Sequence, residues 1–206
     1  MKLLALITFN YFWKFYSHII KFILSYLYKF KVGKNFFCAG TPKIFVNSNK
    51  IIIGDNVEIM GDIDLRLREK GEIIIGNNVR IDHDCRFVAA KNGKIIIGDN
   101  SYIGSNSIWN SGEDIIVGKK CLFSSWTSLN ANDHSISRDK YVRDQGFVYN
   151  KIIIEDDCFV GTNVSVHKGT TVKKGSIIGS NSVVTKDTTE YSINIGIPSK
   201  QISERK

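Results

Sequence analysis

The chain has 206 residues, and its 43% of hydrophobic and 23% of charged residues suit one folded domain and argue against disorder. The net charge of +8 is uneven: residues 1–54 hold eight Lys and no acidic residue, whereas residues 55–206 hold 20 basic and 20 acidic residues. This balance excludes a basic domain body of the kind that binds nucleic acid. Thirty-one Ile and 14 Val against nine Leu indicate a chain built mainly from β-strands.

Residues 1–43 form the first predicted segment, an amphipathic helix. Its polar residues recur at steps of three or four and make one stripe, while the remaining face is rich in Phe, Tyr, Ile and Leu. The stripe contains Asn10, Lys14, Ser17, His18, Lys21, Ser25 and Lys29. The longest uncharged stretch has eleven residues, too few for a clean membrane span, which needs about 20. Two interpretations of residues 1–30 stay open: packing on the domain or a neighbouring subunit, and peripheral contact with a membrane.

Residues 51–184 carry an internal repeat. An aliphatic residue recurs every six positions, without a break from Ile154 to Val184. This period fits neither an α-helix nor an alternating strand, and it predicts a three-sided coil with one inward aliphatic side chain per side. Strings such as IIIGDN mark larger repeats, spaced 22, 22 and 20 residues apart from Ile53 to Val117. We interpret the following gap of 37 residues, from Val117 to Ile154, as two turns and one extra residue.

The coil is expected over residues 44–190, with about seven turns, a polar loop over 130–151 and a C-terminal tail over 191–206. Three cysteines, Cys85, Cys121 and Cys158, each follow an aliphatic repeat position by four residues. We therefore expect reduced thiols at small inward sites of the core. Cys38 lies outside the repeat and is not assigned.

The repeat resembles that of the hexapeptide-repeat acyltransferases. The resemblance implies an all-β fold, a left-handed parallel β-helix, and a homotrimer with active sites between subunits. Residues 124–186 look like the sugar O-acetyltransferase branch, which includes galactoside, maltose and capsular or lipopolysaccharide acetyltransferases. The matching elements are Asp133-His134, Phe159-Val160-Gly161, residues 178–187 and residues 196–200. The branch uses acetyl-CoA as donor and needs no metal.

The resemblance assigns His134 as the general base, a role that suits imidazole because its pKa lies near neutrality. Asp133 either orients His134 or caps a turn. Asn110 either positions the acceptor sugar or is a turn residue. Trp126 either stacks on a sugar ring or packs in the wall. Phe159 stands where the family often has Trp; it can line a channel but cannot donate a hydrogen bond.

The donor should lie along the C-terminal turns, where relatives bind coenzyme A in a groove between adjacent β-helices. Matching positions are Gly161, Thr162, Ser180, Thr185 and Lys186. Lys186 and Lys200 are candidates for the donor phosphates, with a solvated surface charge as the alternative. His83 and His167 are expected at walls or corners. The spacing of His83, His134 and His167, 51 and 33 residues, does not match a zinc site of β-helix enzymes.

Together these residues predict an acetyl-CoA-dependent O-acetyltransferase acting on a carbohydrate, for example a bacterial surface polysaccharide or its precursor. The sugar hydroxyl would attack the thioester directly, without an acyl-enzyme. Such an enzyme would work in the cytoplasm or at the inner face of the membrane. Two alternatives stay open: an N-acetyltransferase on an amino sugar nucleotide, and a non-catalytic, membrane-associated assembly module.

Overall fold

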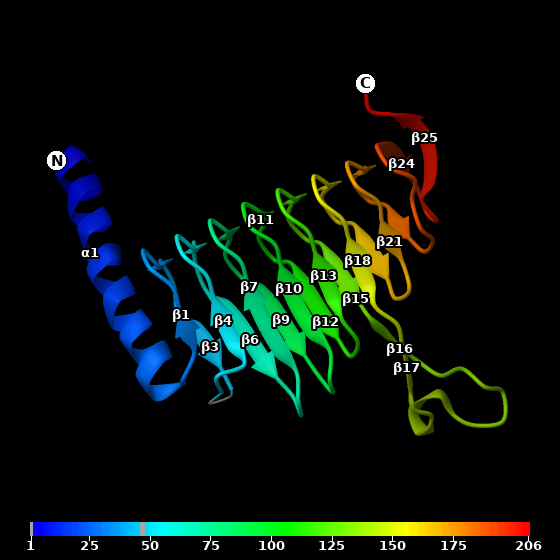
Figure 1. Cartoon of the computed structure of the whole chain (residues 1–206), viewed down its shortest axis with the longest axis horizontal. Coiled ribbons are helices and arrows are strands. Elements are labelled where there is room, and N and C mark those ends of the chain that lie inside the picture. Colours follow the sequence, from blue (N-terminus) through cyan, green and yellow to red (C-terminus); the bar gives the residue numbers. More distant parts are fainter. Residues whose placement is uncertain (1, 46–47) are drawn as a thin grey trace.

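The structure is a computed structural model that describes residues 2–45 and 48–206, with side chains from residue 11 onward. Three parallel sheets form the walls of a β-helix, and the chain visits them in the same order in every turn (Figure 1). A helix lies at one end of the stack and a β-hairpin at the other. The expected all-β class, parallel β-helix and N-terminal helix are confirmed; the left-handed sense rests on the resemblance.

Each wall is one sheet, named here A, B or C. Sheet A contains β1 (Lys31–Val32), β4 (Ile51–Ile53), β7 (Glu72–Ile75), β10 (Lys94–Ile97), β13 (Ile115–Val117), β18 (Ile152–Ile154) and β21 (Thr171–Val172). Sheet B contains β2 (Phe37–Cys38), β5 (Glu58–Ile59), β8 (Arg80–Ile81), β11 (Tyr102–Ile103), β14 (Leu122–Phe123), β19 (Phe159–Val160) and β22 (Ile177–Ile178). Sheet C contains β3 (Pro42–Ile44), β6 (Ile63–Leu67), β9 (Cys85–Ala89), β12 (Ile108–Ser111), β15 (Ser128–Asn130), β20 (Ser165–His167) and β23 (Val183–Val184). One strand from each sheet makes a turn, so the described residues form seven turns.

The six-residue spacing produces the inward ladders of the core. In sheet A, Ile53, Ile75, Ile97, Val117 and Ile154 are partners in successive strands, and all five are buried. Strands stack about 4.8 Å apart, so each side chain packs on the equivalent one in the next turn. Full burial of one such side chain contributes roughly 1.5–3 kcal/mol. The repeat therefore encodes both the shape of the coil and its stability.

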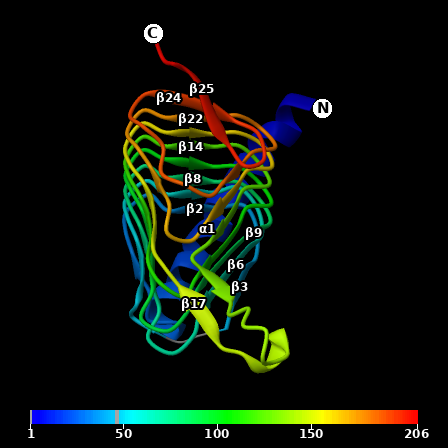
Figure 2. The ribbon, with the colours of Figure 1, turned by 90° about the vertical axis from the view of Figure 1, so that its right-hand side faces the viewer.

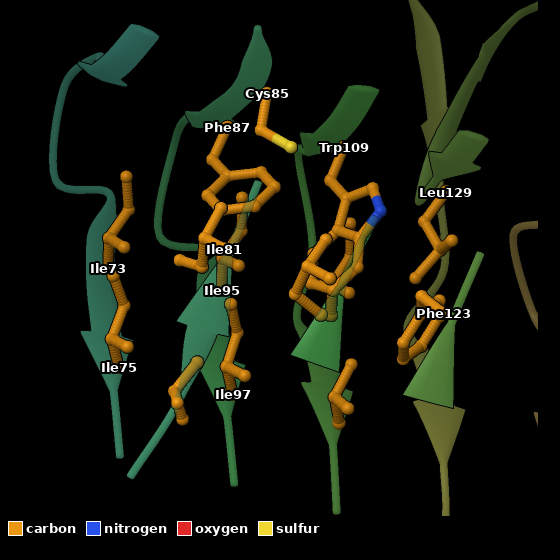
Figure 3. Close-up of a cluster of buried hydrophobic side chains, with 14 of the residues drawn as sticks. Ile73, Ile75, Ile81, Cys85, Phe87, Ile95, Ile97, Trp109, Phe123 and Leu129 are labelled. Atoms are coloured by element: carbon orange, nitrogen blue, oxygen red, sulfur yellow. The ribbon is translucent and has the colours of Figure 1, made fainter. Parts of the chain in front are cut away.

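Aromatic rings fill the middle of the core (Figure 3). The Trp109 ring lies 4.8 Å from that of Phe87 and 5.1 Å from that of Phe123, measured between centroids. All three side chains have no solvent exposure. The Trp109 Nε1–H points at Thr127 Oγ1 at 3.5 Å. These rings occupy three successive turns of the coil, just before the chain reaches the candidate site.

Asparagines form the corners between sheets A and B. Asn35, Asn56, Asn78 and Asn100 adopt positive φ angles of 52–60°, which Asn tolerates better than most residues. Their side chains form a ladder, because Asn56 Nδ2 donates to Asn78 Oδ1 at 2.8 Å and Asn78 repeats the bond to Asn100 at 3.2 Å. The G-D-N strings of the sequence are thus corner signals.

The gap of 37 residues is one turn, not two. Val117 pairs directly with Ile154, and Asn130 pairs with His167 across the same gap. The chain finishes sheet C at Asn130, makes a long excursion and then enters sheet A at Ile152. The excursion leaves the wall because its residues pair with one another instead of with neighbouring turns.

Both ends of the coil also differ from the expected boundaries. Helix α1 spans Lys2–Phe22 and continues as a π-helical turn, Ile23–Leu27. The coil begins at Lys31, which pairs with Ile52, and not at residue 44. At the other end, residues 191–206 are not a loose tail. Strand β24 (Ser192–Ile195) pairs with β22, and β25 (Lys200–Glu204) returns antiparallel to it, so this hairpin extends sheet B.

All four cysteines are free and buried, as expected for Cys85, Cys121 and Cys158. Cys38, unassigned from the sequence, pairs with Ile59 and is the inward residue of the first turn in sheet B. Burial raises the pKa of Cys38 to about 11 and that of Cys85 to about 12. These two thiols are therefore protonated near neutrality and act as small apolar side chains.

No helix in the described part of the chain is both long enough and apolar enough to cross a membrane.

Trp109→Ala should destabilise the fold by roughly 3–5 kcal/mol, because it leaves a cavity among packed aromatic rings. The matched control is Trp126→Ala, which removes the same atoms from a side chain that is 59% exposed. Thermal melts of both variants check this. Equal losses of stability in the two would contradict the assignment of Trp109 to the central core.

Candidate active site

An antiparallel ribbon carries the predicted base away from the coil. Strand β16 (Asn132–His134) pairs with β17 (Phe147–Tyr149), and the loop between them projects from the edge that joins sheets C and A (Figure 2). His134 lies opposite Phe147, with the two ring centroids 4.1 Å apart. The imidazole is exposed.

The loop at the tip of the ribbon is held by its own hydrogen bonds. Gln145 Oε1 accepts from the Ser137 amide at 2.7 Å. The Gln145 side-chain amide donates to the Ser137 and Lys140 carbonyls at 2.9 and 3.0 Å. A short 3-10 turn, Val142–Asp144, closes the loop. The loop therefore has a defined shape although most of it is exposed.

The base of the ribbon is fixed on the coil through Tyr149. The Tyr149 ring packs against Gly112, where a Cβ atom would come within 2.3 Å of the ring. Lys91 also contacts this ring, because its ammonium nitrogen lies 3.7 Å from the ring centroid. This anchoring lets a rigid coil position an exposed histidine.

His134 and Asn110 line one hollow of about 340 Å³ on the outer face of sheet C. The Asn110 side chain donates to Asn130 Oδ1 at 2.9 Å, and Asn130 lines the same hollow. Asn110, Asn130 and His167 are register partners in three successive turns. The structure thus brings Asn110 and His134 together, and Asn110 is a strand residue instead of a turn residue.

Asp133 does not bind the imidazole in this chain. Its carboxylate forms an ion pair with the Lys168 ammonium at 2.6 Å. Asp133 and His134 are neighbours in β16, and both line the hollow that contains Asn110. The carboxylate of Asp133 is therefore held by Lys168, and its role in orienting His134 stays a prediction. Asp133 and Lys168 also border a second hollow, of about 620 Å³, which lies along the loop and reaches His134.

Trp126 does not pack in the wall, one of its two predicted roles. It is 59% exposed and lies at the corner between sheets B and C with a φ of 65°. The equivalent corner residues in neighbouring turns are Asn106 and Asn163, with φ of 59° and 57°. A bulky side chain is uncommon in this conformation, which costs free energy. An exposed, strained Trp is available to a ligand or a partner on this edge.

The predicted donor residues lie on two different edges. Gly161, Thr162 and Ser180 form the edge between sheets B and C, where the Thr162 amide donates to Ser180 Oγ at 3.2 Å. Thr185 and Lys186 follow β23 on the edge between sheets C and A, one turn beyond His167 and Lys168. Sheet C separates the two groups, so one chain does not gather them into a single groove.

Two further predicted residues have positions of their own. Phe159 is half-buried on the outer face of sheet B, just before the B–C edge. The hollow that His134 lines lies instead on the outer face of sheet C. Lys200 is exposed at the start of β25, opposite Ile195 in the hairpin. Gly161 also has a structural reason to be glycine, since a Cβ there would come within 2.7 Å of the Ser180 amide.

Sequence reasoning missed Asn130 and Lys168. Asn130 follows Asn110 by 20 residues, the spacing that separates Ile97 from Val117, so the repeat itself held the signal. Lys168 was missed because its partner Asp133 lies on a ribbon that the repeat does not describe. The other histidines meet their expectation: His83 is an exposed corner residue paired with Asp84 at 2.9 Å, and His167 lies in a wall.

Comparison with known proteins finds partial matches to one family model and to several acetyltransferases. The model of the hexapeptide repeat of succinyl-transferase matches residues 94–123 and 151–186. The galactoside O-acetyltransferase of Lactococcus lactis is 35% identical over 86 residues, 41% of either chain. The chain spans less than half the length of the curated relatives that it matches.

Two solved structures share the fold. A polySia-specific acetyltransferase superposes with a TM-score of 0.58 and 27% identity, over 85% of this chain and 81% of that one. An N-acyltransferase from Bacillus cereus, solved with dTDP-4-amino-4,6-dideoxyglucose and coenzyme A, superposes with a TM-score of 0.63 and 23% identity, over 85% and 83%. In its repeat, its fold and these relatives, the chain is similar to the hexapeptide-repeat acyltransferases.

Proposed function

We propose that this protein transfers an acetyl group from acetyl-CoA to a hydroxyl of a carbohydrate, with His134 as the general base. The observation that carries the proposal is the placement of His134. An ordered ribbon holds this exposed imidazole beside a hollow lined by Asn110 and Asn130. The similarity to galactoside and polySia acetyltransferases supports a sugar as the acceptor.

The chemistry requires few groups. The sugar hydroxyl oxygen attacks the thioester carbonyl carbon while a neutral His134 takes the hydroxyl proton. The tetrahedral intermediate then collapses, the carbon–sulfur bond breaks, and coenzyme A leaves as its thiol after receiving a proton. Amide groups such as those of Asn110 and Asn130 suit hydrogen bonding to the neighbouring hydroxyls of a sugar. We assign these two residues to acceptor positioning.

The complete site in this proposal needs two copies of the chain. The base side contains His134, Lys168 and Lys186 on the C–A edge, whereas the donor side contains Thr162 and Ser180 on the B–C edge. In a cyclic trimer each copy places one edge against a different edge of its neighbour. This arrangement would bring the two sides together in three identical grooves. It would also place the exposed Trp126, on the B–C edge, beside one of these grooves.

Transfer of the acetyl group to an amino group stays the second candidate. The similarity in fold to an N-acyltransferase that binds an amino sugar nucleotide favours it. The same assay separates the two. Acetyl-CoA is incubated with glycans and with amino sugar nucleotides, and the mass gain of one acetyl group is mapped to oxygen or nitrogen.

His134→Ala should lower kcat by roughly 10²–10⁴, because it removes the general base and leaves the coil intact. The control is His18→Ala, the same substitution at an exposed histidine of α1. Thermal melts of both variants should match the wild type. A kcat in the His134 variant equal to that of the control would refute the proposed mechanism.

Lys186→Ala should weaken binding of coenzyme A, and added salt should weaken it in the wild type, since the donor carries phosphates. Lys70→Ala is the control, because Lys70 is an exposed lysine on the same C–A edge near the opposite end of the stack. Titration calorimetry at two salt concentrations measures both effects. If Lys186→Ala leaves the dissociation constant unchanged, Lys186 does not bind the donor phosphates and is a solvated surface charge.

A further inference from the structure

Among the side chains described from residue 11 onward, α1 and the π-helical turn after it bury one narrow face against the coil. Ser17, Ile20 and Leu24 are buried against the first turn. Ser17 Oγ accepts from the Cys38 amide at 2.8 Å, and the Lys21 ammonium donates to the Gly33 carbonyl. Part of the predicted polar stripe therefore faces the protein and not the solvent.

The opposite face of the helix is apolar and uncovered. Tyr11, Phe12, Phe15, Ile19, Phe22 and Tyr26 are all exposed, between 43% and 71%. At 100° per residue the five that lie in α1 occupy one sector of the helix, centred almost opposite Ser17, and Tyr26 follows in the π-helical turn. Five of the six are aromatic, so this aromatic face is a large apolar patch of the kind that marks a contact surface.

Position and charge narrow the choice of partner. The helix lies across the end of the stack, so its aromatic face points away from the coil (Figure 1). Exposed lysines lie close to it in the chain: Lys14 on the helix itself, and Lys29, Lys31 and Lys34 just after it. Residues 1–54 contain no acidic residue, and the nearest acidic residues, Asp55 beside Lys34 and Glu58 in one hollow with Lys14, belong to the next turn.

We propose that the aromatic face of α1 docks on an anionic lipid surface. Aromatic and aliphatic side chains would enter the region between headgroups and acyl chains, while the lysines contact the anionic headgroups. A second copy of the chain fits less well, because two such faces would bring their lysines together, and residues 1–54 hold no acidic residue to pair with them. The face with Ser17 and Ile20 would stay packed on the coil. The helix would therefore lie flat on the membrane and hold the β-helix against it.

This proposal is independent of the acetyltransferase reaction. It predicts that the enzyme works beside lipid, which would suit an acceptor that is itself attached to a lipid.

Co-sedimentation with vesicles tests the docking. The full chain is mixed with vesicles of phosphatidylcholine alone and with vesicles that also contain phosphatidylglycerol. Wild type should sediment with the anionic vesicles, and high salt should reduce the bound fraction. The triple variant Phe12→Gln, Phe15→Gln, Phe22→Gln should lower the partition coefficient at least about tenfold.

The matched control is the double variant Ile197→Gln, Ile202→Gln. These side chains are 74% and 59% exposed at the opposite end of the stack, so they should not affect binding. Lys29→Gln with Lys31→Gln should weaken binding to anionic vesicles without touching the helix, which keeps the test valid if the triple variant unfolds. Equal sedimentation of wild type and triple variant would overturn the proposal. A wild type that does not sediment with anionic vesicles would also overturn it. The same holds if the wild type forms assemblies with itself that only the triple variant loses.

Discussion

The structure depends on one constraint: each side of each turn must direct an aliphatic side chain into the same narrow core. Ile75 packs on Ile53 and Ile97 because their strands are in register, and the same holds around the other two walls. Hydrophobic burial and the backbone ladder thus enforce each other along the whole stack. Because the register is rigid, an outward residue keeps its place relative to its neighbours. Asn110 and Asn130 meet for this reason.

The candidate site arises where this constraint is interrupted. After Asn130 the chain leaves the wall, and the ribbon places His134 over the outer face of sheet C. The coil itself supplies the other groups along its edges. Thr162 and Lys186 lie on different edges of the same prism, and this separation is the structural argument for a site shared between two copies. Catalytic geometry would then depend on assembly as well as on folding.

The six-residue spacing was enough to predict the coil, its inward residues and the buried thiols. It failed in the excursion for a specific reason: Ile136, Val142 and Val148 continue the spacing in phase with Ile154, yet they are 80%, 50% and 46% exposed. Periodicity cannot distinguish these residues from core residues, because only strand pairing decides which turns stack. The first turn was missed although residues 33–38 repeat the pattern of residues 54–59, since Phe36 and Cys38 replace aliphatic residues. The pairing of Asp133 with Lys168 depends on the ribbon and could not be predicted.

Complementation between two inactive variants tests whether the active site is shared between two copies of the chain. His134→Ala removes the base side, and Thr162→Trp blocks the donor side at an exposed position. Each variant alone should be inactive. When equal amounts are unfolded together and refolded, about a quarter of the wild-type sites should recover, because a random trimer pairs two intact edges at that frequency. Activity no higher than that of the separate variants would show that the site lies within one chain.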